Sequence, residues 1–242
     1  MTKQDHLLIY LHIPKTAGST LKHIIRKQYR SGEVWFQTRN QMVPVLGTAD
    51  KANELKCVGG HYWFGIHQQF NKPYKYITML RHPIDRIASE YYYILGRPNH
   101  QAYSKVKTMS FMEFIDHFPL KSSNQQTRRI SGLIQQPELQ LAKKNIQNDF
   151  IVVGVSEMFD ESVFLMKEAC NWGDISFTSV NVTKNRPTLA DIPKDVVEKL
   201  NEENKLDLEL YNFAKTELVK KIENLDRDSK TKLQQFINQQ SV

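Results

Sequence analysis

The sequence predicts an α/β domain in which a central, mostly parallel sheet is flanked by helices. Three observations carry this prediction. A strand, a short loop and a helix follow one another at residues 7–29, and the same arrangement returns at residues 74–95. An apolar strand at 150–155 is followed by a helix at 158–172. Strands that alternate with helices are typical of parallel sheets, because the chain must cross the sheet between parallel neighbours.

The first unit begins with the apolar run LLIYL at residues 7–11, which has the length and composition of a strand. Pro14 ends this run, and residues 15–20, KTAGST, are small, polar and turn-forming. Apolar residues then return at helical spacing from Leu21 to Tyr29, with basic residues on the opposite face. The expected order is therefore strand, tight loop and helix.

The loop of this unit has the chemistry of a phosphate-binding site. A helix N-terminus presents unpaired N–H groups and the positive end of the helix dipole. Lys15 adds a cation, and Thr16, Ser19 and Thr20 add three hydroxyl groups. The loop is not the GxxxxGK[ST] motif of nucleoside triphosphatases, because Lys15 precedes Gly18 instead of following it. The alternative interpretation is an ordinary strand-to-helix turn with a solvated lysine.

The second unit is a strand at residues 74–80, YKYITML, followed by a helix that starts near Pro83. Arg81 stands at the end of the strand, and Ser89 lies about two turns into the helix. Ligands of α/β sheets bind beyond the carboxyl ends of the strands. Arg81 and Ser89 are therefore expected to hold a second anionic group near Lys15.

Each of these two residues also has a plain structural interpretation. Arg81 could form an ion pair with Asp85 or Glu90. Ser89 could be a hydroxyl on the helix surface, which is the common case for a single serine.

His61 is the candidate general base. It follows two glycines at the end of an expected strand, within the aromatic segment HYWFGIH at residues 61–67. Histidine titrates close to neutral pH, as a general base must. A single histidine is more often structural, and His67 is an equal rival on pattern alone. The segment lacks the HExxH spacing of a zinc site, and no metal is expected.

The remaining chain adds weaker patterns. Residues 124–130 are polar and basic, residues 181–188 form a basic loop, and the tail after about residue 227 is polar, in the manner of a frayed helix. The expected elements are a short buried segment at 35–36, a strand at 57–61, a helix at 108–118 and helical structure from 193 onward.

Composition limits the possible partners and locations. The chain has 242 residues and a formal charge of +7, which favours anionic ligands without choosing among them. Cys57 and Cys170 form no CxxC pattern, so a disulfide framework and a metal site are not expected. No signal peptide or membrane-spanning stretch is evident, which predicts a soluble, cytoplasmic protein. A longer protein with its anchor removed would look the same.

Two segments in this order resemble a known family. HIPKTAGST at residues 12–20 and LRHPIDRIASEYY at residues 80–92 resemble the 5′- and 3′-phosphate motifs of PAPS-dependent sulfotransferases. The similarity is greatest to the branch that contains the heparan sulfate 2-O- and 6-O-sulfotransferases and their small bacterial relatives. Residues 124–129 resemble the N-x-Q-T-R stretch of that branch, and the resemblance covers most of residues 7–218.

The resemblance implies a P-loop-NTPase-like three-layer fold in one domain over residues 1–242, with a core at about 7–218 and a polar helical tail at about 219–242. It implies PAPS (3′-phosphoadenosine 5′-phosphosulfate) as cofactor and PAP as product. It implies that His61 takes the proton from the acceptor and that Lys15 steadies the charge on the leaving phosphate. The implied cofactor-binding residues are Lys15, Thr16, Ala17, Gly18, Ser19, Thr20, Arg81 and Ser89, together with Lys184 and Arg186 of the basic loop.

The leading hypothesis is therefore metal-independent, in-line transfer of a sulfuryl group to a hydroxyl, with a glycan or glycolipid as the expected acceptor. A kinase-like phosphotransferase that needs Mg²⁺ is the first alternative. A non-catalytic relative that binds PAP or a polyanion is the second. Nucleic acid is not expected as a partner. The acceptor and the oligomeric state cannot be predicted from these residues.

Overall fold

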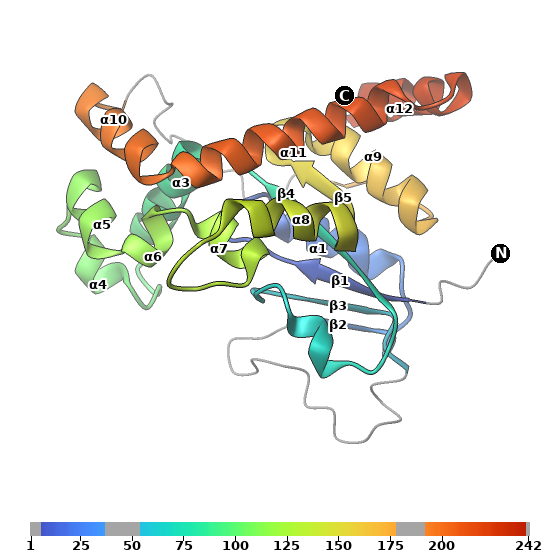
Figure 1. Ribbon diagram of the computed structural model, residues 1–242, viewed down its shortest axis with the longest axis horizontal. Helices are drawn as coiled ribbons and strands as arrows, with labels where there is room; N and C mark the ends of the chain where they lie inside the picture. The colour runs from blue at the N-terminus through green and yellow to red at the C-terminus, as the bar shows by residue number, and fades with distance from the viewer. Residues whose placement is uncertain (1–5, 37–53, 178–191, 241–242) are drawn as a thin grey trace.

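The computed structural model describes residues 6–36, 54–177 and 192–240 (Figure 1). In this part of the chain a five-stranded sheet has the strand order β2-β3-β1-β4-β5. The strands are β1 (Leu7–Leu11), β2 (Val34–Phe36), β3 (Cys57–Gly60), β4 (Tyr74–Leu80) and β5 (Phe150–Val155). All four pairings in this sheet are parallel. The prediction of a mostly parallel sheet is confirmed.

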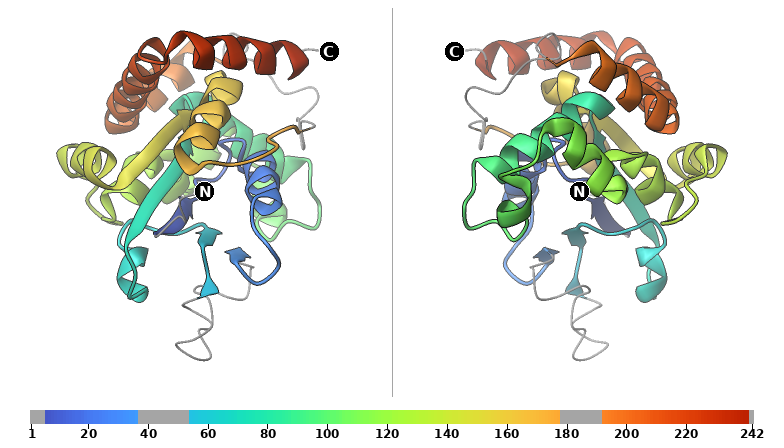
Figure 2. Two further views of the ribbon diagram at one scale, coloured as in Figure 1. Left: turned by 90° about the vertical axis from the view of Figure 1, so that its right-hand side faces the viewer. Right: turned by 90° about the vertical axis from the view of Figure 1, so that its left-hand side faces the viewer.

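Helices on both sides of the sheet complete a three-layer arrangement. In Figures 1 and 2, α8 and α11 lie over one face of the sheet, and α1 and α9 lie over the other. The helices that follow the first strands are α1 (Gly18–Lys27), the 3₁₀ turn η1 (Ile66–Gln69), α3 (Pro83–Leu95), α4 (Tyr103–Val106), α5 (Phe111–His117), α6 (Pro119–Ser122), α7 (Gln125–Ser131) and α8 (Leu139–Asp149). After β5 come η2 (Ser156–Met158), α9 (Phe159–Cys170), α10 (Lys194–Glu203), α11 (Lys205–Glu223) and α12 (Arg227–Gln240).

The core explains why these segments form these elements. All five residues of β1 are fully buried, as expected for a central parallel strand covered on both faces. In α1, Leu21, Ile24 and Ile25 recur at helical spacing and are fully buried against the sheet cluster. A second apolar cluster joins α3, α4, α5 and α10 at the end of the molecule where α3 begins. The two apolar clusters hold the helices against the sheet and against one another.

Several local expectations are corrected by the structure. Helix α1 begins at Gly18, so Ser19 and Thr20 stand in its first turn and not in the preceding loop. The polar segment 124–130 is mostly helix α7, and the tail is the regular helix α12 with Leu233 buried. Helix α8 was not predicted from the sequence, although its apolar residues pack on the sheet cluster.

Candidate active site

Three segments meet at the edge of the sheet where β1, β3 and β4 end. Leu11 of β1 is paired with Gly60 of β3 and with Thr78 of β4. The three strands therefore reach this edge side by side. From it the chain leads into the β1–α1 loop, into the loop that begins with His61, and through Arg81 into α3. The two predicted phosphate motifs therefore both lie beyond the carboxyl ends of the strands, where ligands of α/β sheets bind.

The β1–α1 loop has an unusual backbone. Lys15 and Ala17 adopt left-handed conformations with φ of 70° and 61°. Such a conformation costs about 1–3 kcal/mol for a residue with a side chain, so the surroundings must hold the loop in place. Part of that support is the buried hydroxyl of Thr16, which donates to the carbonyl of Ile13 at 2.9 Å. The loop ends at Gly18, whose N–H group belongs to the unpaired first turn of α1.

Arg81 lies against the same loop. Its Nη1 donates to the carbonyl oxygen of Lys15 at 3.2 Å, so the two predicted phosphate motifs are in direct contact. The alternative partner Glu90 accepts from Lys121 Nζ at 2.9 Å. Burial raises the pKa of Glu90, but Lys121, Arg86 and Lys15 outweigh burial and keep the carboxylate ionised.

Two further residues of α3, Ser89 and Tyr93, have a defined environment. Ser89 is only 6% exposed, so its interpretation as a surface hydroxyl is wrong. Tyr93, one turn further along, supports Lys15, whose ammonium lies 3.5 Å from the centre of the tyrosine ring. The guanidinium of Arg97 lies 4.4 Å from the same ring. One tyrosine of α3 thus lies against two basic side chains, Lys15 of the loop and Arg97, which follows the helix.

His61 stands beside a second histidine that the sequence analysis did not single out. Nδ1 of His61 lies 3.0 Å from the backbone carbonyl of His12, and the two rings stack with centroids 4.4 Å apart. A carbonyl only accepts, so Nδ1 carries the proton of this hydrogen bond, and Nε2 of the neutral ring is the nitrogen with the lone pair. This tautomer is the one that a general base at Nε2 requires.

The surroundings keep both rings neutral. Desolvation, followed by the charge of Arg129, holds the pKa of His61 below its ordinary value. Burial, followed by the neighbouring His61, lowers the pKa of His12 further. An imidazole with a lowered pKa is unprotonated at neutral pH and can accept a proton.

Two residues of α7 also contact these segments. The sequence does not mark Gln126 as a candidate, and it makes Arg129 equally a contact for an acidic glycan or a solvated basic residue. The side chain of Gln126 accepts from the N–H of Arg81 at 3.0 Å and donates to its carbonyl at 2.9 Å. Nη1 of Arg129 donates to the carbonyls of His61 at 2.7 Å and of Tyr62 at 2.9 Å. The available signal was the polar NQQTRR run, which has no apolar periodicity to mark it as a helix.

A family model described as "Sulfotransferase family" matches residues 1–214. The chain belongs to the sulfotransferase family. The predicted family resemblance is thereby confirmed over most of the chain.

Curated relatives place the similarity within this family. Heparan-sulfate 6-O-sulfotransferase 2 of Gallus gallus is 26% identical over 88% of this chain and 67% of its own length. The protein of the same name from Homo sapiens is 25% identical over 88% of this chain. The matched region spans only 44% of that human protein.

A solved structure supports the fold. The crystal structure of mouse sulfotransferase SULT7A1 complexed with PAP matches with a TM-score of 0.51 at 15% identity, over 88% of this chain and 90% of the other. At this identity the match establishes the architecture and nothing finer. The predicted P-loop-like three-layer fold is confirmed by this match together with the parallel sheet.

The other predicted residues of this sulfotransferase-family chain have different outcomes. His67 stacks on Tyr74 at 3.9 Å, and its Nδ1 lies 2.8 Å from the hydroxyl of Tyr76. Tyr74 is the first residue of β4, so His67 lies at the opposite end of that strand from Arg81. Lys184 and Arg186 lie outside the described residues, and their role stays a prediction.

Searches for a metal site and a membrane span concern the described residues alone. There, no cluster of three or more His, Cys, Asp or Glu side chains has the geometry to hold a metal ion. None of the helices described combines the length and apolar character needed to cross a membrane.

Proposed function

We propose that this protein transfers the sulfuryl group of PAPS to a hydroxyl group of a carbohydrate acceptor. The observation that carries the proposal is the contact between the two phosphate motifs, in which Arg81 donates to the backbone of Lys15. The family match supports sulfuryl transfer, and the names of the heparan-sulfate relatives support a glycan or glycolipid acceptor. PAPS supplies an activated sulfuryl group when it is bound.

The residues at the edge of the sheet fit the two ends of this cofactor. The β1–α1 loop approaches α1 closely, since a Cβ atom at Gly18 would lie 1.7 Å from Nε2 of His12. A lysine beside a helix N-terminus suits the 5′-phosphosulfate. We assign Lys15, Thr16, Ala17, Gly18, Ser19 and Thr20 to that end. Arg81 and Ser89 are assigned to the 3′-phosphate.

The reaction assigned to the chain's own residues is one proton transfer and one charge stabilisation. Nε2 of His61 removes the proton of the acceptor hydroxyl as that oxygen attacks sulfur. Lys15 stabilises the charge that develops on the leaving phosphate oxygen, as a fixed cation does in a site with little water. The ring of Tyr93, 3.5 Å from the ammonium, supports the cation in this position. The whole chain is proposed to act as one catalytic domain.

Calorimetric titration with PAP and with AMP, both in EDTA, tests the proposed function. Tight binding of PAP with much weaker binding of AMP is expected, because AMP lacks the 3′-phosphate that Arg81 and Ser89 would hold. Lys15→Ala and Arg81→Ala are each expected to weaken PAP binding. Equal affinity for PAP and AMP would favour a polyanion-binding relative, and activity that is lost in EDTA would favour a Mg²⁺-dependent phosphotransferase.

Variants of the same purified protein test the role of His61 as general base. His61→Ala is expected to keep its affinity for PAP and to lose turnover by roughly 10²–10⁴-fold. His67→Ala is the matched control, because that ring packs at the other end of β4. Near-normal turnover in His61→Ala would remove this residue from the role.

A further inference from the structure

Helix α7 contacts the two sides of the proposed site at the same time. Gln126 and Arg129 are three residues apart, so their side chains leave the same face of the helix. Gln126 holds the backbone of Arg81 through both of its peptide groups. Arg129 holds the backbone at His61 and Tyr62. One short helix therefore fixes the residue assigned to the 3′-phosphate and the residue assigned as base.

Arg129 contacts residues 61–64 through more than its guanidinium group. The carbonyl of Arg129 accepts from the N–H of Phe64 at 2.8 Å. The side chain of Arg129 also lies over the ring of Trp63, with 4.8 Å between the guanidinium carbon and the ring centre. Four consecutive residues, 61–64, are thus held by a single arginine.

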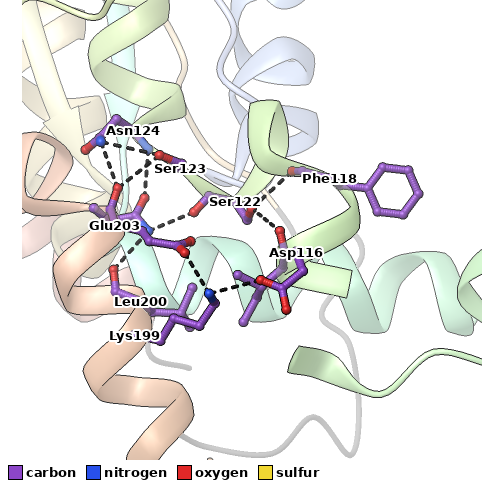
Figure 3. A network of polar contacts seen from close by, with 10 residues as sticks. Asp116, Phe118, Ser122, Ser123, Asn124, Lys199, Leu200 and Glu203 are labelled. Carbon is purple, nitrogen blue, oxygen red and sulfur yellow. Dashed lines mark hydrogen bonds and ion pairs between the residues drawn. The ribbon is translucent and has the colours of Figure 1, made fainter. Parts of the chain in front are cut away.

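Helix α7 is itself anchored by buried polar contacts. The carboxylate of Asp207 accepts from the N–H groups of Gln126 at 3.0 Å and Thr127 at 2.7 Å, and from the Thr127 hydroxyl. At the start of the helix, Asn124 Nδ2 donates to the carbonyl of Glu203 at 2.7 Å (Figure 3). These contacts tie α7 to the junction of α10 and α11, so the helix cannot move without breaking buried hydrogen bonds.

We propose that α7 is the positioning element of the site, with Arg129 as the positioning residue for His61 and Gln126 as the positioning residue for Arg81. The inference rests on the proposed function. Misplacing a reacting group by about 1 Å can cost roughly 10²-fold in rate, so an element that sets both groups controls the rate without touching the reaction.

Arg129 also affects the charge state of the base. The groups that face His61 are His12 from the end of β1, Lys22 of α1, Glu90 of α3 and Arg129 of α7. Among these charges Arg129 has the largest effect on the pKa of His61, and it lowers it. Burial lowers the pKa of Arg129 itself to about 10, so the side chain is charged at neutral pH.

The first experiment compares Arg129→Gln and Arg129→Lys with the control Arg128→Gln. The neighbouring Arg128 donates to the carbonyls of Ser123, Ile134 and Gln135 and so serves a different segment. Turnover, the dissociation constant of PAP, the KM of the acceptor and the pH profile of kcat/KM for PAPS are measured for the full-length variants.

For Arg129→Gln, turnover is expected to fall roughly 10–100-fold while the affinity for PAP stays within about threefold. The acidic limb of the kcat/KM profile of this variant is expected to move to higher pH. Loss of a positive charge raises the pKa of His61, so the base stays protonated, and inactive, to a higher pH than in the wild type. Arg129→Lys keeps the charge but not the guanidinium geometry, so its limb should stay in place while turnover still falls.

Three results would overturn the role of Arg129. A parallel loss of PAP affinity and turnover would mean a general structural defect. A raised KM for the acceptor, with the acidic limb of the kcat/KM profile unchanged, would make Arg129 a substrate contact. Equal effects of Arg128→Gln and Arg129→Gln would remove the specific role. If the wild type binds PAP without preference and transfers no sulfuryl group, the proposed function itself fails, and the inference falls with it.

Gln126→Leu tests whether Gln126 positions Arg81, and only ligand binding is measured. Leucine fills a similar volume but cannot hold the peptide groups of Arg81. The dissociation constant of PAP is expected to rise about tenfold and that of AMP by less than threefold, since AMP has no 3′-phosphate. Equal weakening of both ligands, or of neither, would contradict the role of Gln126.

Discussion

His12 occupies the tightest point of the site. Its ring stacks between Tyr10, at 5.2 Å, and His61, at 4.4 Å. Its Nε2 points at Gly18, where a Cβ atom would lie 1.7 Å away. These two stacked contacts, together with Gly18, restrict the movement of the ring. A glycine at this position is therefore required by the close approach of His12 and not by its own backbone angles.

Gly18→Ala is expected to lower turnover at least tenfold, because the added methyl group pushes His12 against His61. The cost in stability should be about 1–3 kcal/mol, as for other overpacked sites. Turnover and urea unfolding check both values. Gly173→Ala is the matched control, since a Cβ atom there meets its nearest neighbour at 3.8 Å.

The double variant His12→Ala/Gly18→Ala decides the cause of the effect. If the clash is responsible, removal of the ring relieves it, and the stability loss of the pair is smaller than the sum of the single losses. Additive losses would mean that Gly18 acts through something other than His12.

At the residue scale, the sequence could predict that segments marked by a local motif lie close together. Lys15 and Arg81 stand at the ends of recognisable strands, and the structure brings them into contact. The contacts of Arg129 and His12 could not be predicted because they join distant segments: Arg129 reaches a carbonyl 68 positions away. A single sequence contains no periodic signal for such a pairing.

At the scale of elements, α1 could be predicted from its apolar stripe, whereas α7, which is held by polar contacts, could not. Helix α1 buries a regular stripe and was found within a few residues. Helix α7 buries Gln125, Gln126 and Thr127 instead, which sequence patterns attribute to exposed segments. Its stability comes from Asp207, a partner 80 residues away that no local pattern reveals.

Asp207→Ala is expected to destabilise the protein by about 2–4 kcal/mol. The carboxylate is fully buried and accepts three hydrogen bonds from residues 126 and 127, so its removal leaves buried donors unpaired. Asp226→Ala is the comparison, because that exposed side chain caps α12 through Ser229 and should cost only about 1 kcal/mol. Urea unfolding gives both values, and equal costs would show that burial of Asp207 is unimportant.

For the whole molecule, a parallel sheet flanked by helices was predicted from three strand–helix units. Parallel strands need crossing helices, so alternation alone predicted the sheet, and the strand bounds agree closely with the runs in the sequence. The tail was harder, because a polar sequence with one apolar residue per turn resembles a frayed end. The ring of Phe236 in α12 nevertheless lies 6.4 Å from that of Phe164 in α9. The last helix therefore packs on the main core.

Leu233→Ala tests whether α12 belongs to the cooperative unit that carries the site. Leu233 is 6% exposed, and its truncation is expected to cost about 2–3 kcal/mol. The affinity for PAP should change less than twofold, because α12 packs against α9 and not against the edge where β1, β3 and β4 end. Circular dichroism and tryptophan fluorescence are followed in the same urea titration, with the exposed Gln234→Ala as control. If α12 is part of the domain, both signals shift together to lower urea. If it folds apart from the rest, helical signal is lost early while the fluorescence transition stays in place, and the functional domain then ends before residue 227.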